Sequence, residues 1–527
     1  MAAQPLFTDN MRPKPRVRPE AGNSPPPSEN RNASDAAAIS LGGRFLTFIG
    51  RTMYMGRFGF GATGPLLNIF SFALLLPNVI FTVLGAALNA VMIPVYNSLL
   101  AEEKKDEAKK FIDNVISISF VLLGVLVVAG IFAAPLISAL VEGGDFENPE
   151  YLTFALRILM PVVIFFGFGA IFQGLLQSHG VFRLPAFVSA PGGIILILYI
   201  VFLGDKFGVT GLIFATALGI FTQPLIMIPA IRRLGYRYKF SFDLKNKNIR
   251  DAGKLCVPVL ISAASYQMHF LFGHSIALRL NTTAIMDYSQ QLVQVFILTI
   301  VYAIAAVYFP KLSVLWAKAD SHGYNESLRN ALLYTFFLVL PAASGFFLLR
   351  FEIMDFLLNW RGESNAEGIL LAGNLMGIYA IGVIAISFKE IADRAFYSEK
   401  DSKTPAIFGV LIMAVNIIAV LLLIPMLGAY AMPAAYGIAA VIGGGGLILK
   451  LNRKIKFINF AFLFEILKIV FAAGTMITAA FFARNFHFTD IRIINLIIPA
   501  IAGAAVYFAV AYSLKISALS AVLGGRK

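Results

Sequence analysis

The chain has 527 residues, of which 58% are hydrophobic and only 14% are charged, and its mean hydropathy is +0.78. In soluble domains roughly a quarter of all residues are charged, so this composition excludes a soluble globular protein. The net charge is +14, but the basic residues do not gather into an aromatic-rich patch, which argues against a nucleic-acid partner. The single cysteine excludes a disulfide framework and a paired-cysteine metal site. We therefore expect a polytopic membrane protein.

The first 39 residues differ in composition from the rest. They are rich in Pro, Ser, Asn and Arg and hold few large apolar side chains, so they cannot bury enough surface to offset the entropy of ordering. No apolar core of about 7–15 residues near the start marks a secretory signal. We interpret residues 1–39 as a disordered tail, which its bases hold on the cytoplasmic side.

Fourteen apolar segments are long enough to cross a membrane as helices, which takes about 20 residues each. The first, seventh and tenth carry ionisable residues and are the weakest candidates. The predicted fold class is therefore all-α, with about fourteen transmembrane helices. The predicted spans are 40–62, 65–97, 111–140, 151–178, 184–203, 207–230, 252–280, 285–310, 327–350, 365–392, 404–426, 429–450, 458–483 and 490–515.

The loops between these spans alternate in charge. The loops after spans two, six, eight, ten and twelve carry lysines and arginines, whereas the loop after span three carries Glu142, Asp145, Glu147 and Glu150. Basic residues concentrate in cytoplasmic loops. We therefore expect both termini in the cytoplasm and an even number of spans.

Two sequence landmarks recur six spans later. Residues 177–186 resemble residues 397–406, at an offset of 220, and Pro94 has a counterpart in Pro310, at an offset of 216. An even number of intervening spans gives both halves one orientation, as in parallel-repeat transporters; the alternative is a chance similarity between apolar stretches. The repeat predicts two pseudo-symmetric six-helix lobes, residues 40–230 and 231–450, followed by residues 451–527 with two extra helices and a C-terminal tail.

Two arginines lie on one face of the first span. Arg44 and Arg51 are seven residues apart and point the same way from a helix, whereas Arg57 points about 120° away from Arg51. A charge at membrane depth normally faces the bundle interior or a water-filled cavity. We expect Arg44 and Arg51 to face such a cavity, with snorkelling to the cytoplasmic head groups as the alternative for Arg44. Arg57 is expected to snorkel to the outer interface.

Polar side chains form stripes at helical spacing on spans two, seven and eight. Such stripes either bond neighbouring helices or line a polar cavity, and their presence in both halves favours a shared cavity. The stripes are Ser71, Asn78, Thr82, Gly85 and Asn89; then Ser262, Ser265, Tyr266 and His269; then Asp287, Gln290, Gln291 and Gln294. The candidate substrate-binding residues are Arg44, Arg51, Asn78, Ser262, Ser265, His269, Asp287, Gln290 and Gln291.

Other charges in the spans stand at the spacing of helical ion pairs. The sequence holds no Walker-type phosphate loop and no His-Glu-x-x-His motif, so it supports neither ATP use nor metal-dependent hydrolysis. We expect no catalytic residue, no metal and no cofactor, and transport driven by the membrane potential, a monovalent cation or the substrate's own gradient. The expected ion pairs are Lys389/Asp393, Glu390/Arg394 and Glu465/Lys468.

Several short motifs are similar to signature turns of one family. On these motifs the chain resembles the MurJ (MviN) family of the MOP exporter superfamily, from about residue 40 to residue 516. The most specific is Tyr397-Ser398…Asp401…Lys403-Thr404-Pro405. The others are Gly174-Leu175-Leu176-Gln177-Ser178…Phe182…Pro185-Ala186-Phe187, Leu76-Pro77-Asn78, Ile93-Pro94-Val95-Tyr96, Arg157…Met160-Pro161 and Ile231-Arg232-Arg233-Leu234-Gly235-Tyr236-Arg237-Tyr238.

The resemblance implies two six-helix lobes around a central cavity, plus two extra helices. It also implies a bacterial cytoplasmic-membrane protein that flips lipid II, the undecaprenyl-pyrophosphate-linked peptidoglycan precursor, to the outer leaflet. Its partners would be lipid II, membrane lipids and, as further candidates, cell-wall synthesis proteins. Arg44 and Arg51 match the paired arginines of the family's first helix, one residue further apart than usual, and guanidinium groups suit a pyrophosphate.

The chain departs from the family pattern around the predicted cavity. Asn68 stands where many members have an acid, Phe81 where they usually have an arginine, and Tyr288-Ser289-Gln290-Gln291 lacks the usual cation. The cavity should therefore be less positive than in other members. One alternative is export of another undecaprenyl-linked glycan or of a cationic drug. A cationic drug requires acids in the cavity, and Asp287 is the one unpaired acid in the predicted cavity. The other alternative is a non-transporting scaffold for cell-wall synthases that docks through residues 1–39.

Overall fold

The computed structural model describes residues 27–59, 64–87, 92–143, 146, 148–359, 366–486 and 492–519. In this part of the chain the regular elements are helices, and the β-type pairing is one isolated bridge between Gly143 and Phe146. The predicted all-helical fold is confirmed.

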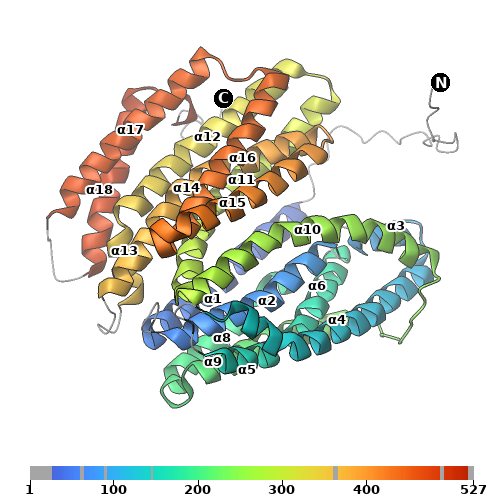
Figure 1. The fold of residues 1–527 in the computed structure, drawn as a ribbon. Helices are drawn as coiled ribbons and strands as arrows, with labels where there is room; N and C mark the ends of the chain where they lie inside the picture. The colour runs from blue at the N-terminus through green and yellow to red at the C-terminus, as the bar shows by residue number, and fades with distance from the viewer. Residues whose placement is uncertain are drawn as a thin grey trace, which may run out of the picture.

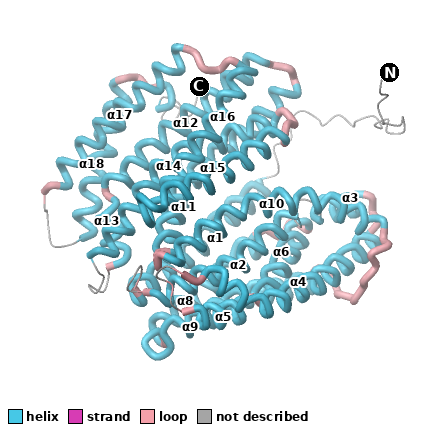
Figure 2. Tube along the Cα trace, viewed as in Figure 1, coloured by secondary structure: helices cyan, strands magenta, loops and turns pink. Residues whose placement is uncertain are grey.

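The helices are long, and the turns between them lie at their ends (Figure 2). In chain order they are α1 (Pro27–Phe58), α2 (Pro65–Ala87), α3 (Ile93–Ala101), α4 (Lys105–Val141), α5 (Pro149–Leu159), α6 (Val162–Ser178), α7 (Arg183–Phe187), α8 (Ser189–Phe202), α9 (Gly204–Arg233), α10 (Lys247–Arg279), α11 (Thr283–Ala317), α12 (Ser321–Leu348), α13 (Arg350–Leu358), α14 (Ala366–Ser398), α15 (Lys403–Leu427), the short 3₁₀ helix η3 (Gly428–Tyr430), α16 (Ala431–Ile455), α17 (Phe460–Arg484) and α18 (Arg492–Ser513).

Eleven stretches of the described chain are long and apolar enough to cross a membrane, and one of them, Lys403–Ile455, contains both α15 and α16. Together they cover twelve of the fourteen predicted spans. The other two predicted spans lie in α1 and α10, which are helices of 32 and 33 residues but are less apolar. Helix α1 begins at Pro27, inside the segment that the sequence assigns to the tail.

The helices form two groups (Figure 1). Helices α1–α9 lie in one group and α11–α18 in the other, while α10 packs against α2 and α4 of the first group and against α15 of the second. Helix α10 therefore connects the groups, and the predicted lobe boundary at residue 230 stays a prediction.

Helix packing repeats between the two groups, which is what an internal repeat predicts. In the first group α1 packs on α8, α8 on α9 and α6 on α9. Six predicted spans later α10 packs on α15, α15 on α16 and α14 on α16.

The turns repeat as well. Gly180 and Lys400, at the offset of 220, both have positive φ, at 75° and 63°. The amide that follows each closes the same turn, because Val181 N donates to the Leu176 carbonyl at 2.9 Å and Asp401 N donates to the Phe396 carbonyl at 3.0 Å. A 6→1 hydrogen bond of this kind closes the end of a helix when the residue after the helix adopts a left-handed conformation.

A second pair of turns, at the offset that separates Pro94 from Pro310, also shares one backbone conformation. Glu103 and Ala319, at the offset of 216, have φ of 59° and 56°. The amide that follows each bonds back across the turn at 3.0 Å. The predicted repeat is therefore present in backbone conformation.

Helix α1 is held in place by a close crossing with α8. A Cβ atom at Gly193 of α8 would lie 2.8 Å from the backbone nitrogen of Thr47 in α1. Small residues allow helix backbones to approach this closely in membranes. The crossing fixes the helix that carries Arg51.

Candidate functional site between the two helix groups

Arg51 of α1 reaches across to α11 in the other helix group. Its guanidinium forms an ion pair with the Asp287 carboxylate and donates a hydrogen bond to the side-chain oxygen of Gln291. Asp287 and Gln291 are one helical turn apart and share a face. The side chains of Arg51 and Asp287 are 17% and 34% exposed, so the charge on Arg51 is balanced and partly shielded from solvent.

Neighbouring contacts support this pair. The Thr52 Oγ1 and Tyr288 Oη atoms lie 2.8 Å apart. The ring of Phe48 stacks on that of Tyr288 at 6.0 Å between centroids. Phe48 also meets Phe296 of α11 edge to face at 6.3 Å, so an ion pair, hydrogen bonds and two aromatic contacts join α1 to α11.

His274 of α10 lies beside the carboxylate. The imidazole is buried, and its Nδ1 lies 2.8 Å from the Phe270 carbonyl oxygen. A carbonyl only accepts, so Nδ1 is the donor of this hydrogen bond. The Nε2 atom lies 3.8 Å from Asp287 Oδ1, beyond hydrogen-bond range, and has no hydrogen-bond partner among the described residues.

Asn68 of α2 joins the groups a second time. Its fully buried amide donates from Nδ2 to the Asn281 carbonyl at 2.7 Å and accepts from the Ala284 N–H at 2.9 Å. The side chain therefore holds the turn between α10 and α11 from both sides. A carboxylate at this position could accept from Ala284 but could not donate to Asn281.

A third link joins the end of α10 to the end of α4. The guanidinium of Arg279 donates to the carbonyl of Val141 at 3.2 Å and to that of Leu140 at 2.7 Å. These links, the Arg51–Asp287 pair and the Asn68 contacts all lie near the end where α10 passes into α11, and Figure 1 shows the two helix groups meeting there.

The structure brings together only part of the predicted substrate site. Arg51, Asp287 and Gln291 meet, but the neighbouring Gln290 is buried and faces a cavity of about 30 Å³ inside the second group, with His274. Such a volume holds about one water molecule. Among the described residues no hydrogen bond joins Asn78 to the cluster; its side chain donates to the Leu74 carbonyl of its own helix at 2.8 Å.

Four predicted site residues cannot be placed. The backbones of α1 and α10 are described where these residues occur, but the four side chains lie outside the described part of the structure, so their roles stay predictions. They are Arg44, Ser262, Ser265 and His269.

Other charged residues form contacts that hold the fold. The predicted pairs are confirmed, with Lys389–Asp393 at 2.5 Å, Arg394–Glu390 at 3.8 Å and Lys468–Glu465 at 2.8 Å. Arg57, expected to snorkel, instead keeps a buried side chain and pairs with Asp205 at the start of α9.

Sequence reasoning missed two residues of the cluster, Asn68 and His274. Asn68 stands out in the sequence only as a departure from a family pattern, although an amide in an apolar helix is a signal for a buried partner. His274 lies five residues after His269 and so falls outside the stripe noted on that helix.

This fold resembles that of solved membrane transporters. A structure titled as an inward-facing conformation of a multidrug resistance MATE family transporter of the MOP superfamily aligns with 81% of this chain and 98% of its own, with a TM-score of 0.64 and 16% identity. A structure titled as lipid II flippase MurJ in an inward closed conformation aligns with 93% of this chain and 99% of its own, with a TM-score of 0.77 and 21% identity. The chain therefore has the all-helical, multi-pass fold of these membrane proteins.

Sequence comparison narrows this class to one family. The family described as lipid II flippase MurJ matches residues 58–500. A protein of Burkholderia cenocepacia named lipid II flippase MurJ is 24% identical over 407 residues, which cover 75% of this chain and 78% of that protein. The chain belongs to the MurJ lipid II flippase family, whose members are transporters and not enzymes.

Proposed function

We propose that this protein moves lipid II from the inner to the outer leaflet of a bacterial cytoplasmic membrane by alternating access. Family membership supports the substrate class. The observation that carries the proposal is the Arg51–Asp287 pair, because it places a phosphate-binding group at the contact between the two helix groups. Transport needs no cofactor and draws on the membrane potential, a monovalent cation or the gradient of lipid II.

In this proposal Arg51 exchanges one anion for another. A guanidinium binds phosphate oxygens through two parallel, charge-assisted hydrogen bonds. The pyrophosphate of the substrate carries more charge than the Asp287 carboxylate and competes with it for Arg51. Release of Asp287 removes the ion pair between α1 and α11 and so weakens the contact between the groups. The seven-residue spacing in the sequence predicts that Arg44 would supply a second guanidinium.

The described arrangement fits the state closed to the outside. By the charges of the loops, both termini and the α9–α10 loop lie in the cytoplasm. The turn between α10 and α11 then lies on the outer side, together with the Asn68, Arg51 and Arg279 contacts.

A second candidate substrate is another undecaprenyl-linked glycan. Two observations favour it: Arg51 is neutralised by Asp287, and Gln291 of the same cluster stands in the motif where the family usually has a cation. A weaker positive field suits a head group with less charge than a pyrophosphate-linked peptidyl disaccharide.

The test is an outer-leaflet assay in cells depleted of their own flippase. The full chain is expressed, and lipid II exposed on the outer surface is measured with an impermeant enzyme that cleaves it. We expect exposure to return to the level before depletion. A chain that inserts normally but leaves lipid II inside would reject lipid II, and restored exposure of a different undecaprenyl-linked glycan in the same cells would support the second candidate.

A further inference from the structure

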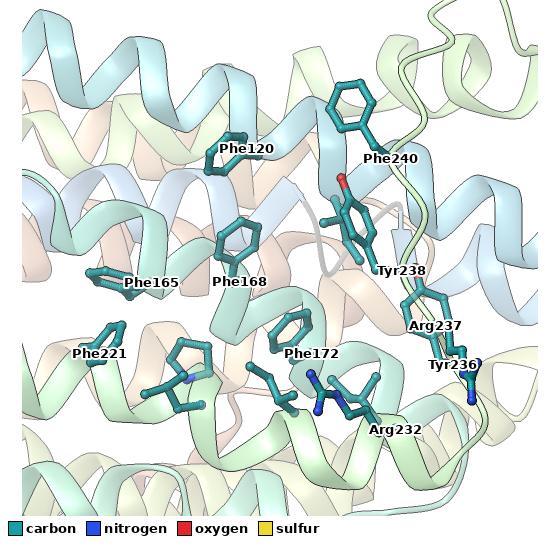
Figure 3. Close-up of a pocket in the computed structure, with 15 residues that line it drawn as sticks. Phe120, Phe165, Phe168, Phe172, Phe221, Arg232, Tyr236, Arg237, Tyr238 and Phe240 are labelled. Atoms are coloured by element: carbon teal, nitrogen blue, oxygen red, sulfur yellow. The ribbon is translucent and has the colours of Figure 1, made fainter.

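A large groove opens in the first helix group, away from the Arg51 cluster. It has a volume of about 1010 Å³ and lies between α4, α6 and α9. Figure 3 shows Phe165, Phe168 and Phe172 along α6, with Phe120 of α4 and Phe221 of α9 beside them. We call this the α4–α6–α9 groove.

The aromatic side chains form a ladder of two contacting sets along the groove. Phe168 stacks on Phe120 at 6.1 Å and on Phe172 at 6.0 Å between ring centroids, and Phe165 meets Phe221 edge to face at 4.8 Å. The wall is therefore apolar and long rather than compact, which suits a hydrocarbon chain.

One end of the groove is basic. Arg232 in the last turn of α9 and Arg237 in the following loop line it, and both side chains are exposed. Within the described residues neither arginine has an acidic partner within 4 Å. Two unpaired guanidinium groups at the mouth of an apolar groove complement an anionic head group on a hydrocarbon chain.

The loop that carries Arg237 is fastened to α4. Tyr236 Oη donates to Asp113 Oδ1 at 2.6 Å, and the Lys239 N–H donates to the same atom at 3.2 Å. Tyr238 Oη lies 2.8 Å from Ser117 Oγ. Burial raises the pKa of Tyr236, and its hydrogen bond to Asp113 raises that pKa further, so the phenol stays protonated as a donor. The basic rim is thus preformed.

The groove has the depth of one membrane leaflet. Phe221 precedes Arg232 by eleven residues of α9, which is about 17 Å along a helix axis. Half of a hydrocarbon core is about 15 Å. The arginines therefore lie at the level of the lipid head groups when the aromatic ladder spans one leaflet, and the orientation proposed above makes this the inner leaflet.

We propose that the α4–α6–α9 groove binds an anionic phospholipid of the inner leaflet, with its phosphate at Arg232 and Arg237 and one acyl chain along the phenylalanine ladder. The lipid would bridge α4, α9 and the loop that leads into α10, the helix that connects the two groups. The site is separate from the Arg51 cluster, so its failure leaves the proposed transport function untouched.

The test uses brominated phospholipids, which quench nearby tryptophan fluorescence. The full chain is reconstituted into phosphatidylcholine vesicles containing brominated phosphatidylglycerol or brominated phosphatidylcholine. The reporter is Phe120→Trp, and the parent chain with its two native tryptophans gives the background. Phe132→Trp, on the same helix at a position 81% exposed and outside the groove, is the control reporter.

We expect the brominated anionic lipid to quench Phe120→Trp at lower mole fraction than the zwitterionic one, by about fivefold for each arginine. The substitution Arg232→Gln with Arg237→Gln should abolish this preference, and Arg233→Gln, at an exposed neighbour that does not line the groove, should preserve it. The control reporter should show no such preference. The proposal is overturned if the two lipids quench equally or if the preference survives the double substitution. It is also overturned if neither lipid quenches, which is the result expected when a second copy of the chain fills the groove.

Discussion

At the residue scale, Asn68 is a fully buried side chain with two backbone partners. An amide both donates and accepts, and here both functions are used on the backbone of one turn, at Asn281 and Ala284. A buried backbone group that loses its partner costs about 1–3 kcal/mol. Asparagine is therefore the residue that this turn requires.

Asn68→Leu should lower the thermal unfolding temperature of the detergent-solubilised chain, because it leaves a buried carbonyl and a buried N–H without partners, at about 1–3 kcal/mol each. Asn78→Leu is the matched control on the same helix, since Asn78 bonds only to a carbonyl that helical bonding already serves. Equal losses for the two variants would show that Asn68 has no special role.

Sequence reasoning at this scale identified residues but not their partners. The spacing of Arg44 and Arg51 and the stripe of Asp287 and Gln291 predicted polar faces on two helices. That Arg51 meets Asp287 depends on how α1 and α11 pack, and the two residues are 236 positions apart. Periodicity gives the face of a helix, but not the side chain that lies opposite.

At the element scale, the repeated turns show how one conformation is built from different residues. Gly180 has no Cβ and adopts positive φ without strain. Its counterpart Lys400 adopts the same conformation at a cost of about 1–2 kcal/mol. In the second turn Asp401 compensates by accepting from the Thr404 N–H at 3.0 Å, and this bond lowers the pKa of the Asp401 carboxyl.

Lys400→Gly should raise the unfolding temperature and Gly180→Ala should lower it, because each changes the strain of a left-handed residue by about 1 kcal/mol. Gly409→Ala in α15 is the control. Its Cβ would meet no atom within 4 Å, so alanine there should stabilise the helix. The account of these turns fails if Gly180→Ala and Gly409→Ala shift the temperature in the same direction.

The sequence predicted most elements because long apolar segments have few structures available in a membrane. Twelve predicted spans coincide with the apolar stretches, and the repeat was visible in short motifs at turns. The start of α1 at Pro27 was not predicted, because the polar residues before position 40 carry no apolar periodicity. The role of α10 between the groups also left no signal in its composition.

At the scale of the whole molecule, the loop charges predict the orientation of the chain in the membrane. The loop around Lys104 is predicted to be cytoplasmic and the one around Glu142 to be outside. In this predicted orientation the contacts of Arg51 and Asn68 would close the outer side, and the α4–α6–α9 groove would lie in the inner leaflet.

Single cysteines in a Cys256→Ser background test this orientation. An impermeant maleimide should label Glu142→Cys in intact spheroplasts and should label Lys104→Cys only after permeabilisation, since both positions are exposed. Labelling in the reverse pattern would invert the proposed topology, and with it the side on which the helix groups meet.

The central claim is that Arg51 binds Asp287 in one state and the substrate pyrophosphate in another. The most direct measurement is the outer-leaflet exposure of lipid II in depleted cells that express Arg51→Gln, Asp287→Asn or both substitutions, with Arg57→Gln as the control arginine of the same helix. We expect Asp287→Asn and Arg57→Gln to keep transport, and both chains that lack Arg51 to lose at least about tenfold, since a hydrogen bond to a charged group contributes about 1.5–3 kcal/mol. If the double substitution instead restores parental exposure, Arg51 serves only to pair with Asp287, and the account is wrong.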